Sequence, residues 1–311
     1  MIYGIMLNPA IDRTQIIPDF SIGRTQKVQS TRVFYAGKGL NVVRTLSLLD
    51  YPATCLAFIG RHDLTSYYQT NPKLKIESVP VSGYTRNNIT ILDPVKKSET
   101  HLREPGFTIT ETDWHNFVEK FTEMLGPGDM VLLSGSLPPG APADAYARLI
   151  RIAHDKRVFS AVDSSGNALK YAVKAMPDLI KINRNELTDW AKASLGDTPI
   201  CLENAARKLI ANGISRAVIT DGQTGAWAFS DQEIWQASFS GTIRTGINTV
   251  GCGDAFFGGL IAQISEKKSL RDALEFATAC GTANTLTPGA GTISADDVDN
   301  CLKLIITRKQ R

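Results

Sequence analysis

Short apolar segments alternate with helical segments along most of the chain, and this alternation restricts the fold more than any other feature. Three of the apolar segments, 130–133, 159–162 and 217–220, end abruptly at glycine or polar residues. The pattern is typical of a mostly parallel sheet that helices cover on both faces. Ligands collect at the carboxyl ends of the strands of such a sheet, so we expect these ends to form one crevice. We expect helices over residues 41–49, 111–125, 143–155, 202–212, 252–264 and 270–286.

Two segments interrupt the alternation, at about residues 12–35 and 82–103. In the second, the run Asn88-Ile89-Thr90-Ile91-Leu92 carries β-branched residues with the period of a sheet that has one solvated face. We expect both segments to form antiparallel strands of a small lid sheet inserted into the core, and residues 1–311 to form a single domain. A lid suits a reaction from which water must be kept.

The composition narrows the class of protein without deciding its chemistry. The chain has 311 residues, 43% of them hydrophobic, and a formal net charge of only +3. This charge is too small and too dispersed to indicate a nucleic-acid partner. No apolar run approaches the length of a membrane span, and the five cysteines lack a paired spacing, which favours reduced thiols. We therefore expect a cytoplasmic protein that binds neither nucleic acid nor membranes.

The run Gly251-Cys252-Gly253-Asp254 places two glycines and a carboxylate at the start of an apolar helical stretch. The glycines allow backbone N–H groups to approach an anion, and the N-terminus of a helix favours negative charge. Asp254 would then lie where it can accept a proton beside that anion. The run therefore predicts a catalytic turn; a tight turn that contains a helix-capping Asp254 is the alternative.

Neither of the two best-known phosphate-binding motifs is present in the sequence. The run Gly37-Lys38-Gly39 lacks the earlier glycine of a P-loop. In the dinucleotide fingerprint a third glycine follows the first two, and here Phe256 occupies that position. A phosphate-binding turn near residue 251 would therefore be of another kind.

A second polar cluster lies near the N-terminus and suits a substrate with several hydroxyl groups. Asp12 follows the first apolar segment, which we expect to be a buried strand, and Asn41 opens a helix. Lys38 stands between two glycines before that helix, and with Arg86 it indicates an anionic substrate, because Lys and Arg bind phosphate well. The alternatives are a helix cap for Asn41 and a surface charge for Lys38.

Six motifs together resemble the ribokinase-like sugar kinases of the PfkB family, and they cover residues 1 to about 291. Within this family the combination most resembles the branch of 1-phosphofructokinases and tagatose-6-phosphate kinases. The resemblance implies an α/β fold, a ribokinase-like three-layer sandwich with a mostly parallel central sheet and a small β-sheet lid. The motifs are Asn8-Pro9-x-x-Asp12, Gly37-Lys38-Gly39-x-Asn41, Thr85-Arg86-x-Asn88, Leu133-Ser134-Gly135-Ser136-Leu137-Pro138, Lys181-x-Asn183-x-x-Glu186 and Asn248 to Asp254.

The resemblance also implies a role for each motif. Asp254 would be the base, and the N–H groups of the turn from Gly251 through Cys252 and Gly253 to Asp254 would stabilise the transferring phosphoryl group. The cofactors would be ATP and Mg²⁺, the latter held by Glu186 through water. The residues implied at the sugar are Asp12, Gly37, Lys38, Asn41, Arg86, Asn88, Arg103 and Lys27. Those implied at the nucleotide are Lys181, Asn183, Glu186, Thr220, Gly222, Gly225, Gly281 and Asn284.

These expectations define a reaction and its alternatives. The expected reaction is ATP-dependent phosphorylation of a ketohexose monophosphate to the bisphosphate, with fructose 1-phosphate ahead of tagatose 6-phosphate, in a homodimer formed through the lid. The alternatives are a kinase of an unphosphorylated sugar or nucleoside and a catalytically silent sugar-binding regulator. The sugar's identity stays open because the sequence departs from the family pattern at Ala36, at Arg61-His62-Asp63, at His101 and at Ile182.

Overall fold

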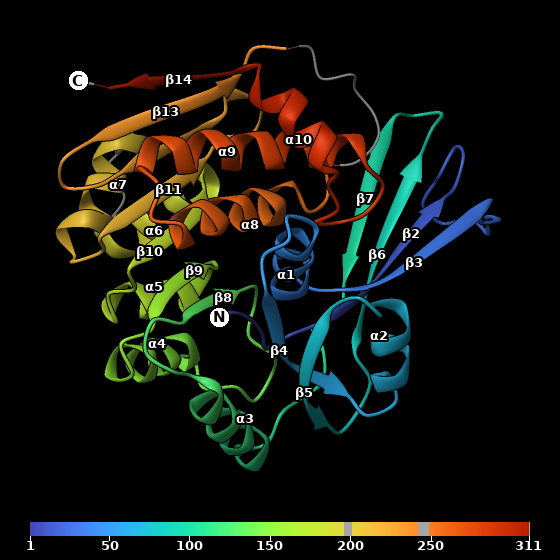
Figure 1. The fold of residues 1–311 in the computed structure, drawn as a ribbon. Coiled ribbons are helices and arrows are strands. Elements are labelled where there is room, and N and C mark those ends of the chain that lie inside the picture. Colours follow the sequence, from blue (N-terminus) through green and yellow to red (C-terminus); the bar gives the residue numbers. More distant parts are fainter. Residues whose placement is uncertain (196–200, 242–248, 311) are drawn as a thin grey trace.

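The structure is a computed structural model that describes residues 1–195, 201–241 and 249–310 (Figure 1). Its central sheet has ten strands in the order β14-β13-β12-β11-β10-β9-β8-β1-β4-β5. The strands from β5 to β11 run parallel, and β12 to β14 add an antiparallel edge. The strands are β1 (Ile2–Met6), β4 (Ala53–Gly60), β5 (Lys75–Val81), β8 (Met130–Ser134), β9 (Phe159–Asp163), β10 (Leu179–Asn183), β11 (Arg216–Thr220), β12 (Ala226–Phe229), β13 (Ile234–Phe239) and β14 (Ile305–Lys309).

Helices cover both faces of this sheet, as the alternating pattern predicts. On one face α3 to α7 bury one cluster of apolar side chains, and on the other α1, α8, α9 and α10 bury a second. The expected α/β three-layer sandwich is therefore confirmed. The helices are α1 (Lys38–Leu48), α2 (Leu64–Thr70), α3 (Glu111–Met124), α4 (Ala145–Asp155), α5 (Gly166–Lys174), α6 (Arg184–Leu195), α7 (Leu202–Ala211), α8 (Cys252–Ser265), α9 (Leu270–Ala283) and α10 (Ala295–Leu302), with short 3-10 turns η1 (Gly222–Thr224) and η2 (Asn284–Leu286).

The predicted helices are present with small changes at their ends. The segment 270–286 divides into α9 and the 3-10 turn η2, and the sequence pattern did not predict α2, α5, α6 or α10. No helix among the described residues is both long and apolar enough to cross a membrane.

A second sheet of four strands projects from the central sheet, in the order β3-β2-β6-β7 (Figure 1). Its strands are β2 (Ala10–Ile16), β3 (Ser30–Ala36), β6 (Arg86–Asp93) and β7 (Ser98–Arg103). The expectation of purely antiparallel strands is wrong, because β2 and β6 pair in parallel. Each of these two strands follows a strand of the parallel core, β1 or β5, and leaves the core in the same direction. Each then turns back as an antiparallel hairpin, with β3 or β7.

A buried tyrosine fixes the base of this second sheet to the core. The hydroxyl group of Tyr67, on α2, contacts two backbone carbonyl oxygens, donating to Ala10 at 2.8 Å or to Ala36 at 2.9 Å. These two residues are paired at the base of β2 and β3. The base of the second sheet, which we call the lid, is therefore held at the carboxyl end of β1, next to the crevice that the parallel strands form.

Candidate active site

A cavity of about 810 Å³ lies at the carboxyl ends of the parallel strands, between the lid and the N-terminus of α8. Parallel sheets place ligands at this edge. All of the residues predicted for the site line the cavity, except Lys27 and Asn284. The motif residue Asn248 lies outside the described residues.

The turn that begins α8 requires glycine at residue 251 and leaves little room for a side chain at residue 253. Gly251 has φ +85°, which L side chains rarely adopt, and a Cβ atom there would lie 2.4 Å from Cα of Ala290. A Cβ atom on Gly253 would lie 3.0 Å from Nζ of Lys181. With these side chains absent, the first N–H groups of α8 and the positive end of its dipole lie at the cavity wall. The turn can therefore stabilise an anion.

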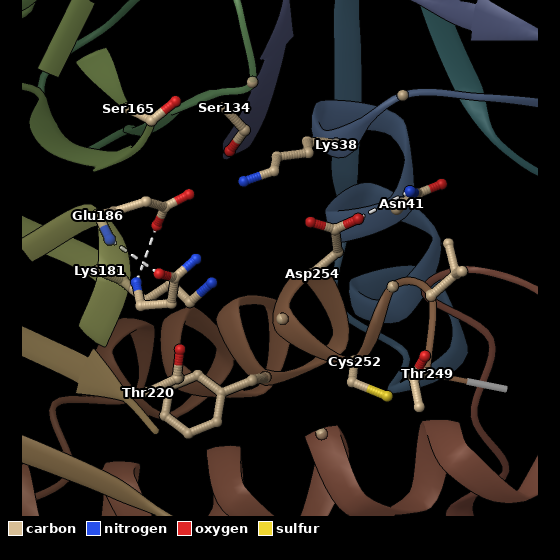
Figure 2. Close-up of a pocket in the computed structure, with 18 of the residues that line it drawn as sticks. Lys38, Asn41, Ser134, Ser165, Lys181, Glu186, Thr220, Thr249, Cys252 and Asp254 are labelled. Atoms are coloured by element: carbon tan, nitrogen blue, oxygen red, sulfur yellow. Dashed lines mark hydrogen bonds between the residues drawn. The ribbon is translucent and has the colours of Figure 1, made fainter. Parts of the chain in front are cut away.

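Asp254 follows this turn and is almost completely buried, with 6% of its surface exposed. Its Oδ2 accepts a hydrogen bond of 2.8 Å from Nδ2 of Asn41 on α1 (Figure 2). Burial raises the pKa of Asp254 to about 6, a shift that the positive charge of Lys38 and the Asn41 hydrogen bond oppose. A carboxylate with this pKa is mainly ionised at neutral pH and is basic enough to accept a proton.

Lys38 and Lys181 share one buried carboxylate, that of Asp163 at the end of β9. Nζ of Lys38 lies 2.8 Å from Oδ1, and Nζ of Lys181 lies 2.7 Å from Oδ2. Burial alone would raise the pKa of Asp163, but the two ammonium groups hold it at about 2. The same carboxylate, with Asp254 and Glu186, raises the pKa of Lys38 although burial opposes this. Both lysines are therefore fixed in place, and Lys38 extends between Ser134 and Asp254 (Figure 2).

The spacing of the Lys181-x-Asn183-x-x-Glu186 motif is explained by reciprocal hydrogen bonds at the start of α6. The N–H of Asn183 donates to Oε2 of Glu186 at 2.8 Å, and the N–H of Glu186 donates to Oδ1 of Asn183 at 2.9 Å. Among the described residues no group of three His, Cys, Asp or Glu side chains could bind a metal ion alone. Mg²⁺ commonly uses one or two carboxylates, waters and substrate phosphates. Glu186 on the cavity wall therefore fits a water-mediated Mg²⁺ site.

The remaining residues predicted at the nucleotide lie at the end of β11 and on α9. Thr220, Gly222 and Gly225 surround the turn after β11, and a Cβ atom at Gly225 would lie 2.0 Å from the carbonyl oxygen of Ala237. Gly281 lines the cavity from α9.

Asn284 is fully buried and holds the turn at Gly251 from behind, without lining the cavity. Its Nδ2 lies 3.1 Å from the carbonyl oxygen of Val250 and 3.5 Å from Sγ of Cys252, and its Oδ1 accepts from the N–H of Thr292.

At the lid end, three polar residues lie side by side on neighbouring strands. Asp12 is opposite Asn88, and Asn88 is opposite Arg103. Nδ2 of Asn88 donates to Oδ1 of Asp12 at 2.9 Å, and burial raises the pKa of Asp12. Arg86, two residues before Asn88, is anchored to the backbone oxygens of Asn8 at 3.1 Å and Pro9 at 3.2 Å. Two guanidinium groups therefore line the lid end of the cavity. Lys27 is exposed on the loop between β2 and β3 and does not line it.

Three residues with a clear place in or behind the site were not among the predicted site residues, although Ser134 belongs to one of the six motifs. Asp163 was recognisable only as the end of a strand, because its partners are 125 and 18 residues away. Ser134 is buried at the end of β8, and its hydroxyl has no hydrogen-bond partner among the described residues. Arg44 contacts Asn41 from one turn further along α1; that helical spacing was the one signal that could have revealed it.

Comparison with known proteins agrees with this geometry. Residues 1–297 match the model of the pfkB family of carbohydrate kinases. The chain is 35% identical over 279 residues to 1-phosphofructokinase of Escherichia coli (strain K12), covering 88% of each chain. It is 28% identical over 310 residues to tagatose-6-phosphate kinase of Staphylococcus epidermidis, covering 98% of each chain.

Among solved structures, phosphofructokinase-2 from Escherichia coli in complex with substrates and products superposes with a TM-score of 0.89. The two chains are 25% identical, and the match covers 97% of this chain and 98% of the other. Fold, motif order and the arrangement of the cavity thus agree with the match of nearly the whole chain to one family. The protein belongs to the pfkB family of carbohydrate kinases, which are phosphotransferases with an alcohol group as acceptor.

Proposed function

We propose that the protein transfers the γ-phosphoryl group of ATP to a hydroxyl group of a ketohexose monophosphate and so forms the bisphosphate. Fructose 1-phosphate is the favoured acceptor and tagatose 6-phosphate the next. The observation that carries this proposal is the pair Arg86 and Arg103 on the cavity wall at the lid end. Guanidinium groups bind phosphate well, and a neutral sugar offers neither of them an anionic partner. Relatives with these two activities agree with the choice.

The proposed chemical step uses Asp254 as the base. Its carboxylate accepts the proton of the acceptor hydroxyl group while the oxygen of that group forms a bond to the γ-phosphorus. The bond from the γ-phosphorus to the bridging oxygen breaks, and its electron pair leaves with ADP. Lys38 was predicted to bind the phosphate of the sugar, but it is faced by Asp163, Asp254 and Glu186. We therefore assign it instead, with the N–H groups of the Gly251 turn, to the negative charge on the transferring group. Asp12 and Asn41 would orient the acceptor by hydrogen bonds to its hydroxyl groups.

At the nucleotide end, Lys181, Asn183 and Glu186 would lie near the phosphates of ATP. Mg²⁺ would be held by Glu186 through water, and when bound it neutralises charge on the phosphate oxygens. The turn from Thr220 to Gly225 and the wall formed by Gly281 would hold the nucleoside.

The substrate assignment is tested by a coupled ADP-release assay with ATP and Mg²⁺. The acceptors are fructose 1-phosphate, tagatose 6-phosphate, fructose 6-phosphate, fructose, ribose and adenosine. Turnover restricted to one ketohexose phosphate supports the proposal and names the acceptor. Turnover only on a neutral sugar or nucleoside contradicts the role of the two arginines, and binding of both ligands without ADP formation identifies a silent regulator.

We further propose a homodimer formed through the lid. Val33 and Phe34 on β3 each expose 41% of their surface, and an exposed apolar strand is stabilised when a partner covers it. Lys27 lies on the loop that joins β2 to β3, so pairing of two lids could bring it near a substrate. A light-scattering mass of one chain at micromolar concentration would contradict the dimer.

A further inference from the structure

The guanidinium group of Arg44 is surrounded by acceptors from four segments of the chain. Nη1 donates to Oδ1 of Asn41 at 2.8 Å and to the carbonyl oxygen of Ala290 at 2.7 Å. Nη2 donates to Oδ1 of Asn71 at 2.8 Å and lies 3.5 Å from the carbonyl oxygen of Tyr35. These acceptors belong to α1, to the segment before α10, to the end of α2 and to the lid strand β3. Arg44 does not line the cavity, so it is placed to act through its neighbours.

Arg44 fixes the orientation of the Asn41 amide from its oxygen side, while Asp254 holds the NH₂ end. A guanidinium group only donates, so Oδ1 of Asn41 must point toward it. The amide NH₂ then points toward Asp254, where the bond to Oδ2 is 2.8 Å (Figure 2). A rotated amide would place its oxygen against the carboxylate and its NH₂ against the guanidinium group. Asn41 and Asp254 are both buried, so this mismatch would be costly.

Arg44 also holds the segment on which the catalytic turn rests. A Cβ atom on Gly251 would lie 2.4 Å from Cα of Ala290, and one on Gly291 would lie 2.3 Å from the carbonyl oxygen of Asn41. The Ala290-Gly291 segment is therefore in close contact with both the turn and α1. Nη1 of Arg44 binds the carbonyl oxygen of Ala290, and Oγ1 of Thr45 lies 3.0 Å from the carbonyl oxygen of Gly291.

We infer that Arg44 is a positioning residue for phosphoryl transfer: it fixes the Asn41 amide and the Ala290-Gly291 segment, and through them Asp254 and the Gly251 turn. The inference rests on the proposed role of Asp254 as the base. A donor aimed at the carboxylate favours its ionised form. A shift of the turn would misplace the N–H groups that stabilise the transferring phosphoryl group.

Several other charged groups also act on Asp254 or on Arg44, so a test of Arg44 must leave those residues unaltered. Lys38, Lys181 and Asp163 all act on Asp254. Arg44 itself is faced by Asp254 and Asp12, and by the neutral side chains of Cys55 and Tyr67. None of these residues is altered when Arg44 is replaced, so a change in the titration of Asp254 reports the loss of the guanidinium group.

The test compares three variants of the full chain by kcat as a function of pH, KM for ATP and thermal midpoint. Arg44→Met removes the guanidinium group and keeps an unbranched side chain. Arg44→Lys keeps the positive charge but loses the planar guanidinium group, whose two terminal nitrogens bind separate acceptors. Arg148→Met is the matched control, because Arg148 is exposed and its side chain pairs, within the described residues, only with Asp144, which precedes the first residue of the same helix.

For Arg44→Met we expect kcat to fall by on the order of 10- to 100-fold with little change in KM for ATP. The acid limb of the kcat–pH profile should move upward by about half a pH unit or more, because the Asn41 amide is no longer held from its oxygen side and a positive charge near Asp254 is lost. In Arg44→Lys the acid limb should lie close to its wild-type position because the positive charge is kept. The value of kcat should stay below that of the wild type because the guanidinium hydrogen bonds are lost. Arg148→Met should match the wild type in both.

A lower thermal midpoint with wild-type kcat and an unmoved acid limb in Arg44→Met would overturn the inference and leave the proposed function intact. If Arg44→Met does not fold, Arg44→Lys decides, and wild-type kcat in that variant would overturn it. Near wild-type turnover of Asp254→Asn would be a different result. It would show that Asp254 is not the base and would contradict the proposed mechanism itself.

Discussion

At the scale of single residues, Asp254 carries the proposed chemistry. Replacing it by asparagine keeps the size of the side chain but removes the proton acceptor. We expect Asp254→Asn to lower kcat by about 10²- to 10⁴-fold while KM for ATP stays nearly unchanged, because the base acts in the transition state. Steady-state kinetics measure both constants. Asp155→Asn, an exposed change at the end of α4, is the control and should leave both unaltered.

The pKa of Asp254 sets a pH dependence. Burial raises this pKa from 3.8 to about 6, so the base is ionised above that pH and protonated below it. We expect kcat to be constant at neutral pH and to fall as the pH drops through about 6. The measurement is kcat against pH at saturating substrates. A midpoint at about 4, the value of an ordinary aspartate, would show that the titrating group is not this buried carboxylate.

At the scale of elements, the start of α8 depends on Gly251. Both Gly251 and Gly128 have φ +85°, but a Cβ atom at Gly128 meets nothing within 4 Å. We expect Gly128→Ala to lower the free energy of unfolding by about 1 kcal/mol without changing kcat. Gly251→Ala adds a clash with Ala290, so it should lower stability further and reduce kcat. Denaturant unfolding and kinetics separate the two effects; equal behaviour of the variants would exclude the close contact.

The Asp163 carboxylate joins β9 to α1 and to β10. Asp163→Asn leaves two ammonium groups without their partner, and we expect it to lower the free energy of unfolding by about 3 kcal/mol at neutral pH. The pKa of Asp163 is held at about 2 in the folded protein, so the stabilisation is complete above about 4 and is lost as the pH falls from there to about 2. The difference from wild type should shrink over that range.

Urea unfolding at several pH values measures the effect of Asp163→Asn. Asp144→Asn, which removes an exposed pair with Arg148, should cost only about 0.5 kcal/mol. If the two substitutions lowered the free energy of unfolding equally, the ion pairs of Lys38 and Lys181 with Asp163 would contribute no more than an exposed pair does.

The elements that local sequence determines are those that could be predicted. The parallel core and the helices at 252–264 and 111–125 follow from hydrophobic periodicity, which each segment carries within itself. The parallel pairing of β2 with β6 was not predictable in this way, because it depends on where two distant hairpins leave the core. The same reason explains why Asp163 did not stand out as the partner of Lys38.

At the scale of the whole molecule, one cavity extends from Glu186, at the end that we propose binds the nucleotide, to Arg86 and Arg103 at the lid end. Motif order predicted which residues line it, whereas Asn284 supports the turn from behind and Lys27 lies outside. Such distinctions depend on the side-chain direction at the end of a helix or on a long loop, which motif spacing does not specify. The central claim is that the lid end selects a phosphorylated sugar.

The most direct test of this claim is the ratio of kcat/KM for fructose 1-phosphate to kcat/KM for fructose, in the wild type and in Arg86→Ala. Charge-assisted hydrogen bonds to the sugar phosphate are worth about 1.5–3 kcal/mol each. We therefore predict a ratio on the order of 100 or more in the wild type, and a ratio at least about tenfold lower in Arg86→Ala with KM for ATP unchanged. A ratio near 1 in the wild type, or one that Arg86→Ala leaves unaltered, would contradict the claim.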